Sequence, residues 1–410
     1  MNDPFRRRIG RRDFLRSAGA LGVGALAGPA ILGGTALGAR RYPDPRPARP
    51  PAALADGRLR VGYLPITDAS PLLLAHALGL YAAEGLEVER PTLFRGWAPL
   101  AEAFQAGVVD VAHFLMPMTF WMRFSVGVPA TVVAWDHTGG SALTVADRID
   151  AVEDLAGATV AVPFWYSVHN VILQILLEQA GLTPLTEGDA SADEGSVKLV
   201  VMAPPDMPPA LANGSIAGYI VADPFNAVAE VNAIGKVLRF TGDVWLDHAC
   251  CVVTVADGLV DGAPDVTQAL VTAVARAQLF ANEERVEAAR ILSDAGEGYL
   301  PQPLPAIQRA LTHYDHAEYT PSGAIRHPDW PTGRIDFQPF PFPSYTQRLW
   351  ELATRTEVEG EREFLESVDP SSVHDDLVDE RFARAAIETL GGPAAFGLPD
   401  DLSREETIDP

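Results

Sequence analysis

Apolar positions along the chain follow two periods in turn, the two-residue period of a strand and the longer period of a helix. Short apolar runs bounded by glycine, proline or polar residues predict buried strands, and longer stretches with one apolar face predict helices. In the first part of the body these elements alternate, at 58–64, 71–84, 86–94, 97–106, 108–115, 119–126 and 129–135. Such alternation predicts a parallel sheet covered by helices.

The same alternation starts again near residue 152. Strands are predicted at 158–163, 197–202, 216–222 and 237–241, and helices between them at 168–180, 207–213 and 225–234. A further strand at 250–255 precedes a long or broken helix at 264–292, and polar helices follow. The predicted fold class is therefore α/β, with two sheets that each form the centre of a lobe.

Ligands of open α/β sheets bind outside the carboxyl ends of the strands, so the loops that follow the predicted strands form the candidate site. These loops are rich in aromatic and hydrogen-bonding side chains. The candidate ligand contacts in them are Asp68, Trp97, Thr138, Ser141, Trp165, Tyr166, His169, Asp223, Phe225 and Asn226. Structural roles stay open beside this one: the two aspartates suit helix caps, 138–141 suits a hinge turn, and the aromatic residues suit a core.

Charge and cysteine content narrow the possible functions. The 410 residues hold 54 Asp and Glu against 31 Lys and Arg, a net charge of −23. Such an acidic body repels a phosphate backbone, which argues against nucleic-acid binding. The two cysteines, Cys250 and Cys251, are adjacent and poorly placed for a disulfide. We expect them to pack as small apolar groups, and we expect no metal site, because His137 and His169 lack metal-ligand spacing.

The first 39 residues have the parts of an export signal. Arg11 and Arg12 begin a basic segment, RRDFLR, and an uncharged stretch rich in glycine and alanine follows at 17–39. The segment resembles signals of the twin-arginine pathway, which places the mature chain in the periplasm or another extracytoplasmic space. A retained N-terminal anchor is the alternative. Residues 40–57 are rich in proline and predict an extended linker.

Four segments of the body carry a resemblance to a known family. They are GYLPITDASP at 62–71, GLYAAEGLEV at 79–88, DLAGATVAV at 154–162, and the pattern AL…GSI…ADPF at 210–225. In order and spacing they resemble the solute-binding proteins of ABC importers in the nitrate, sulfonate, taurine and bicarbonate group. Within that group the nitrate- and bicarbonate-binding branch is the most similar, on Trp97, His113, Met116, His169 and His248.

The resemblance implies a two-lobed periplasmic-binding-protein fold of type II. Two α/β sandwich lobes would enclose a ligand cleft, with hinge crossovers near 141–150 and 241–250. The expected divisions are a first lobe at 58–143 and 248–344, a second lobe at 144–247, and a helical extension at 345–410 that wraps the first lobe. The resemblance also implies a monomer without cofactor or catalytic activity. Such a protein binds a small-molecule ligand and contacts the membrane only through a permease and its ATPase.

The ligand itself stays open. The resemblance places Trp97 and His169 in the pocket, and Met116 is a further candidate ligand contact. The lysine that pairs with the anion in the nitrate branch is replaced here by Ala249, Cys250 and Cys251. A charged hydrogen bond of about 1.5–3 kcal/mol would be lost to a small anion. An organic solute stacked on aromatic side chains fits better, with a nitrate- or sulfonate-like anion as the other class.

Two further functions remain as alternatives. The same fold resembles an enzyme that forms the pyrimidine of thiamine, and Cys250 and Cys251 with His169 suggest that chemistry, although the longer cysteine run of that enzyme is absent. A sensory ligand-binding module is the second alternative. The chain contains no Gly-x-Ser-x-Gly, P-loop or His-Glu-x-x-His motif.

Overall fold

The structure is a computed structural model that describes residues 56–410. The predicted signal peptide at 1–39 and nearly all of the proline-rich linker lie outside the described residues. No helix within the described part of the chain combines the length and apolar composition needed to cross a membrane.

The first lobe is built on a five-stranded sheet in the order β4-β2-β5-β14-β6. Strands β2, β4 and β5 run parallel, and β14 is antiparallel to both of its neighbours. The five strands span Val61–Tyr63 (β2), Thr92–Leu93 (β4), Val111–Leu115 (β5), Ala130–Trp135 (β6) and Cys251–Ala256 (β14). All residues of β5 are buried, as expected for a central strand with helices on both faces.

The helices of the first lobe lie in the connections between these strands and in the segment that follows β14. They are η1 (Thr67–Ala69), α3 (Ser70–Ala77), α4 (Leu80–Ala83), α5 (Trp97–Gln105), α6 (Met116–Phe120), the π-helical turn η2 (Trp121–Val126), α10 (Asp257–Gly262), α11 (Pro264–Glu283) and α12 (Arg285–Leu292). Several of them, α3, α6 and α11 among them, have proline in the first turn, where the missing N–H costs no hydrogen bond. A short ribbon of β1 (Arg58–Leu59) and β3 (Glu87–Val88) lies beside the sheet.

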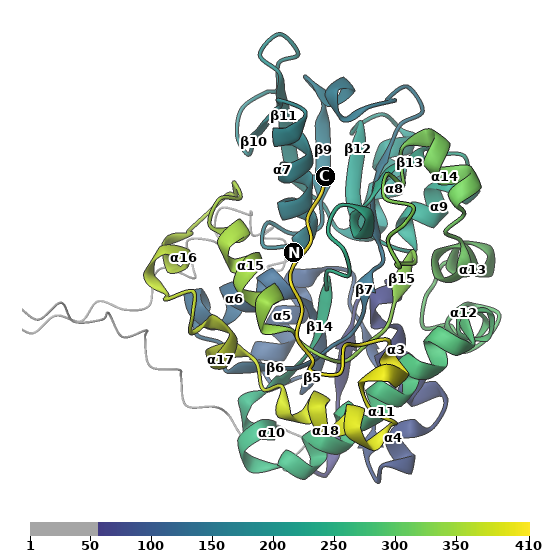
Figure 1. Cartoon of the computed structure of the whole chain (residues 1–410), viewed down its shortest axis with the longest axis vertical. Helices are drawn as coiled ribbons and strands as arrows, with labels where there is room; N and C mark the ends of the chain where they lie inside the picture. The colour runs from purple at the N-terminus through teal and green to yellow at the C-terminus, as the bar shows by residue number, and fades with distance from the viewer. Residues whose placement is uncertain (1–55) are drawn as a thin grey trace, which may run out of the picture. The chain divides into compact units, whose positions relative to one another are not determined.

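The second lobe holds a six-stranded sheet in the order β10-β11-β9-β12-β8-β13. Its strands are β8 (Ser141–Val145), β9 (Thr159–Val162), β10 (Thr183–Leu185), β11 (Ser196–Val201), β12 (Gly218–Ala222) and β13 (Lys236–Phe240). Its helices are η3 (Val152–Leu155), α7 (Val168–Gln179), η4 (Pro204–Asp206), α8 (Met207–Ala212) and α9 (Phe225–Val231). Figure 1 shows β9 and β12 of this sheet in one half of the molecule and β5, β6 and β14 in the other.

The two lobes exchange strands through two crossovers. Residues 136–140 lead from β6 into β8, which lies antiparallel between β12 and β13, and residues 241–250 lead from β13 back to β14, between β5 and β6. The α/β class, the two sheets and the pair of crossovers agree with the sequence prediction. The first crossover lies earlier than the predicted 141–150, because 141–145 forms β8, and the predicted lobe boundary at 143/144 falls inside that strand.

The two crossovers touch each other. The N–H of Gly139 donates to the carbonyl of His248 (3.0 Å), and Thr138 pairs with Ala249 in an isolated bridge. Within the first crossover, β7 (Thr138–Gly139) also pairs with β15 (Ile335–Asp336). Gly139 and Gly140 have positive φ angles of 65° and 77°, a conformation that favours glycine and allows the sharp turn here.

The C-terminal part of the chain contacts both lobes. It contains α13 (Leu304–Thr312), α14 (His316–Ser322), α15 (Pro343–Ala353), α16 (Glu363–Ser367), α17 (Val373–Leu377), α18 (Arg381–Thr389) and η6 (Pro393–Phe396). Helix α18 packs on α11 and β6 of the first lobe. The segment after α15 also bonds to the second lobe, because Gln174 of α7 donates to the carbonyl of Glu357 (2.8 Å) and accepts from its N–H (2.8 Å).

Candidate functional site

Polar side chains from both lobes and both crossovers meet in one buried cluster. We call it the buried centre and define it by Asp68, His137, Ser141, His169, Cys250 and Cys251. Each of these six residues is at most 1% exposed. They come from η1 after β2, from the first crossover and the start of β8, from the first turn of α7, and from the end of the second crossover and the start of β14. The centre thus lies where the carboxyl ends of strands from both sheets meet the two crossovers.

Asp68 and His137 form the first half of the centre. Nε2 of His137 lies 2.9 Å from Oδ2 of Asp68 and 3.2 Å from the backbone N–H of Cys251. A protonated Nε2 cannot accept from that N–H, and an unprotonated one cannot donate to Asp68. Neither carboxylate oxygen of Asp68 has a hydrogen-bond partner within the described residues, so the contact with His137 does not satisfy this buried group.

The two thiols and His169 form the second half. Sγ of Cys250 lies 3.9 Å from Sγ of Cys251 and 3.7 Å from Nε2 of His169, which in turn lies 2.9 Å from Oγ of Ser141. Burial opposes ionisation of both thiols, but Cys251, His169 and His137 lower the pKa of Cys250 well below its ordinary value. Burial raises the pKa of Cys251, and the hydrogen bond and charge of its neighbour raise it further.

Electrostatics couple the two halves. Burial raises the pKa of Asp68 to about 6, although the charge of His137 opposes this. Burial lowers the pKa of His137, but the charge and contact of Asp68 and the Cys250 thiol outweigh it, and the pKa rises to about 10. Here a carboxylate, an imidazole and a thiol change one another's pKa values. Such mutual shifts are typical of a functional site rather than of a passive core.

Further buried polar groups surround the centre and lack partners. Nε2 of His113 accepts from the N–H of Leu64 (2.9 Å), and burial, with the nearby His137, lowers the pKa of His113 to about 3. Nδ1 of His113, Nε1 of Trp97 and both carboxylate oxygens of Asp136 have no hydrogen-bond partner in the described chain. Since buried polar atoms are nearly always bonded, this concentration marks the region as a place for a ligand.

The structure brings some of the predicted contacts to the centre. Asp68, Ser141 and His169 belong to it directly. Met116 is next to it, because its N–H donates to the carbonyl of Cys250 (3.0 Å), and Thr138 pairs with the residue before Cys250. Trp97 lies one layer out, with its ring 5.5 Å from that of His113, and is 3% exposed within the first-lobe core.

The other predicted contacts have partners elsewhere. Asp223 forms a two-point ion pair with Arg334 (2.6 and 3.0 Å). Tyr166 stacks on Trp121 and donates to the carbonyl of Glu361 in the C-terminal extension. The remaining three predicted contacts are packed in the second lobe: Asn226 bonds to Thr144 (2.8 Å) and to the carbonyl of Val221 (2.8 Å), Phe225 accepts from Tyr219 (2.9 Å), and Trp165 is half-buried against the core.

The predicted ligand contacts do not include three members of the centre. The sequence suggests no metal role for His137, because its spacing to His169 is wrong for one, and it predicts Cys250 and Cys251 as small apolar groups, with thiol chemistry only in the enzyme alternative. Their thiols instead face His169 and each other, and the N–H of Cys251 points at His137. One signal was available in the sequence, because the resemblance to the nitrate branch implies an anion-binding lysine in the segment that reads Ala249, Cys250 and Cys251 here.

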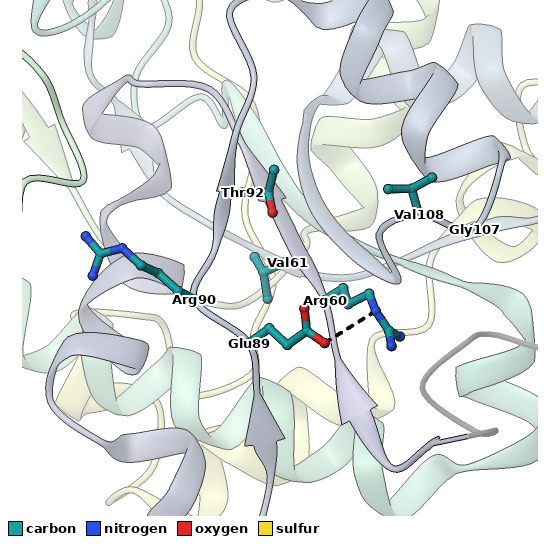
Figure 2. A pocket seen from close by; sticks show the side chains of 7 residues that line it. All are labelled: Arg60, Val61, Glu89, Arg90, Thr92, Gly107 and Val108. Atoms are coloured by element: carbon teal, nitrogen blue, oxygen red, sulfur yellow. Dashed lines mark ion pairs between the residues drawn. The ribbon is translucent and has the colours of Figure 1, made fainter.

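A separate pocket opens on the surface of the first lobe. It is lined by Arg60, Val61, Glu89, Arg90, Thr92, Gly107 and Val108, and Figure 2 shows the ion pair between two of these residues, Arg60 and Glu89 (3.6 Å). Arg60 and Val108 precede β2 and β5, so this pocket lies at the amino ends of these parallel strands. The buried centre lies beyond their carboxyl ends, where open sheets bind ligands.

Comparison with known proteins decides the family. Residues 52–293, more than half of the chain, match the model of the NMT1-like family. The chain belongs to this family. A nitrate/nitrite binding protein of a Nostoc species is 25% identical over 320 residues, which cover 70% of each chain. A nitrate import ATP-binding protein of Synechococcus elongatus is 28% identical over 255 residues, 57% of this chain but 37% of that protein.

A solved structure supports the fold. The periplasmic nitrate-binding protein of Synechocystis has a TM-score of 0.69 and 21% identity, with coverage of 86% of this NMT1-like chain and 93% of that chain. The expected likeness to nitrate-type solute-binding proteins and the two-lobed periplasmic-binding fold are thereby confirmed.

Proposed function

We propose that this chain is the solute-binding component of an ABC importer, which encloses a small solute between its lobes and delivers it to a membrane permease. The observation that carries the proposal is the buried centre, where unpartnered polar atoms from both lobes converge beside two crossovers. Family and fold support it, because the relatives that share them are binding proteins of import systems.

Contacts between the lobes support a closed arrangement. The N–H and hydroxyl of Thr67, in the first lobe, both donate to the carbonyl of Asp223 in the second (2.7 and 3.0 Å). His169 of the second lobe reaches Cys250 at the end of the second crossover. Bending at the two crossovers would separate these contacts and open the centre, and a bound solute would shift the equilibrium toward the closed form.

The centre favours a small polar solute that is neutral or positively charged. Its contacts within the described residues come from carboxylate, imidazole, hydroxyl, thiol and backbone groups, and none comes from lysine or arginine. A nitrate- or sulfonate-like anion would therefore lack a cationic partner. Of the aromatic side chains predicted to contact the solute, Trp97 lies nearest the centre, because Tyr166 already stacks on Trp121 and Phe225 is buried in its own lobe.

The proposed function also involves membrane partners and a location outside the cytoplasm. The solute-binding role implies a permease and an ATPase, and the similarity to an ATP-binding import protein supports that pairing. The N-terminal segment resembles a twin-arginine signal, so we place the mature chain outside the cytoplasm as a monomer. The proposal includes no catalytic step; a turnover assay with pyrimidine precursors would reveal the enzyme alternative.

The test is a thermal-shift screen of the purified chain. Metal cations, neutral and cationic organic solutes, pyrimidines, nitrate, bicarbonate and alkanesulfonates make up the panel. A solute at 100 times its Kd should add about 2.7 kcal/mol to the free energy of unfolding. Ser141→Ala and His169→Gln should reduce this gain, and Ser215→Ala, an exposed serine, is the matched control. A solute whose effect survives both centre variants would contradict this site.

A further inference from the structure

Four side chains of the buried centre have the composition of a metal site. We propose that Asp68, His137, Cys250 and Cys251 bind one zinc ion. Each contributes one ligand atom, and these four atoms all lie within 4.8 Å of one another in a fully buried position. The site is argued from its ligands alone and does not depend on the importer role.

The sulfur atoms already have the separation that zinc requires. With a Zn–S bond of about 2.3 Å and tetrahedral angles, two thiolates of one site stand about 3.8 Å apart. Sγ of Cys250 and Sγ of Cys251 are 3.9 Å apart, and both cysteines are free. The nitrogen and oxygen ligands of such a site stand about 3.3 Å apart, and His137 Nε2 is 2.9 Å from Asp68 Oδ2. Adjustments of about 1 Å at the outermost pairs complete a tetrahedron.

The buried carboxylate of Asp68 also supports a metal site. Its carboxylate is 0% exposed, and neither oxygen has a hydrogen-bond partner in the described residues. A buried carboxylate can accept several hydrogen bonds, and one imidazole contact leaves most of that capacity unused, which is costly unless a further partner such as a metal ion is bound. An ion held between Asp68 and the thiols would give the carboxylate the partner that the contact with His137 does not provide.

The ligand types select the metal. Thiolate and imidazole ligands favour zinc over magnesium or calcium, which prefer oxygen, and a tetrahedral set with two sulfurs is typical of zinc. His169 and Ser141 lie just outside the set: Nε2 of His169 is 3.7 Å from Sγ of Cys250 and 2.9 Å from Oγ of Ser141. Such outer groups orient metal-bound ligands and stabilise a thiolate.

The sequence did not predict this site because the ligands are far apart in the chain. Cys251 is 114 positions from His137, and no short metal-ligand spacing links them. The turn after β2, the first crossover and the end of the second crossover bring the four residues together. Zinc bound there would join the first lobe to both crossovers, and it should therefore stabilise the folded chain.

Cobalt spectroscopy tests the proposal without any variant. The full chain, without a histidine tag, is reduced, stripped with a chelator and titrated with Co²⁺. A tetrahedral site with cysteine ligands shows a thiolate-to-cobalt charge-transfer band and intense d–d bands. The chain has only two cysteines, so that charge-transfer band can come from Cys250 and Cys251 alone. We expect both bands at one equivalent of cobalt and their loss when Zn²⁺ is added.

Metal analysis of variants completes the test. The unmodified chain should retain one zinc per molecule after dialysis, and magnesium should not compete. Asp68→Asn, His137→Gln and Cys250→Ser should each weaken zinc binding at least tenfold, whereas His316→Gln, at an exposed histidine, should not. Circular dichroism shows whether each variant is folded.

Two outcomes would overturn the metal site. One is cobalt bound without thiolate absorption, and the other is a reduced chain that retains no zinc, in which Asp68 and His137 form a simple ion pair. Neither outcome touches the importer proposal, which would still be judged by the non-metal solutes of the thermal-shift panel.

Discussion

Replacing Arg334 with methionine tests how the second lobe is held to the crossovers. The Arg334 side chain is 1% exposed and forms a two-point ion pair with Asp223, from Nε to Oδ2 at 2.6 Å and from a terminal nitrogen to Oδ1 at 3.0 Å. Its other terminal nitrogen contacts Glu230 at 3.0 Å. In the variant Glu230 keeps its ion pair with Arg309, but within residues 56–410 the Asp223 carboxylate keeps only its hydrogen bond from the N–H of Ala227 (3.1 Å).

The expected loss of stability arises at Asp223, because Glu230 keeps a charged partner in the variant and Asp223 does not. Breaking a buried ion pair from one side costs about 3–5 kcal/mol, because the remaining charge stays buried without its partner. Arg334→Met should therefore lower the free energy of unfolding by about this amount. In the double variant with Asp223→Asn the uncompensated charge is gone while an acceptor for Ala227 remains, so about half of the loss should be recovered.

Urea unfolding, followed by circular dichroism and tryptophan fluorescence, measures both variants. Arg290→Met is the control, because Arg290 pairs with Glu287 on the exposed surface, where such pairs contribute little to stability. A loss below about 1 kcal/mol for Arg334→Met, or a double variant no more stable than the single one, would refute the reasoning. Such a result would also mean that the Asp223 carboxylate is free to contact a solute.

Three more buried side chains, Trp97, His113 and Gln174, can be tested in the same way. Trp97→Ala should lower the free energy of unfolding by about 3–5 kcal/mol even without solute, as a thermal melt will show, because Trp97 is 3% exposed and belongs to the core; an unchanged melt would contradict this. The pKa of His113 is about 3 in the folded chain, against an ordinary 6.5 in the unfolded chain. As the pH falls below 6.5, the unfolded chain therefore binds a proton that the folded chain does not. Stability that is present above pH 6.5 is lost as the pH falls toward 3. The loss should reach about 1.4 kcal/mol per pH unit, and His113→Asn should flatten the pH profile; equal slopes would be inconsistent with a neutral buried imidazole. Gln174→Ala should cost about 1–3 kcal/mol and speed amide exchange around Glu357, which loses two hydrogen bonds; unchanged exchange would show that the extension does not depend on this contact.

The local sequence pattern was sufficient to predict most elements of both sheets. Runs such as 158–163 and 197–202 appear as β9 and β11 with only small shifts in their ends, because apolar strands bounded by glycine or polar residues carry a strong local signal. The family signature then indicated two lobes and a pair of crossovers. Strand β8 was missed, because 141–145 directly follows the glycine pair of the first crossover and was interpreted as part of the hinge.

Only the tertiary structure decided the site. Asp68, Ser141 and His169 were predicted because they follow strand ends, but sequence alone could not show which loop ends face one another. The order of strands, with β14 inserted between β5 and β6, carries Cys250 and Cys251 to His137 and Asp68. The same long-range packing pairs Asp223 with Arg334 and places Tyr166 against the C-terminal extension. Periodicity reports which face of an element is buried, whereas the partner of each buried polar group depends on contacts between distant segments.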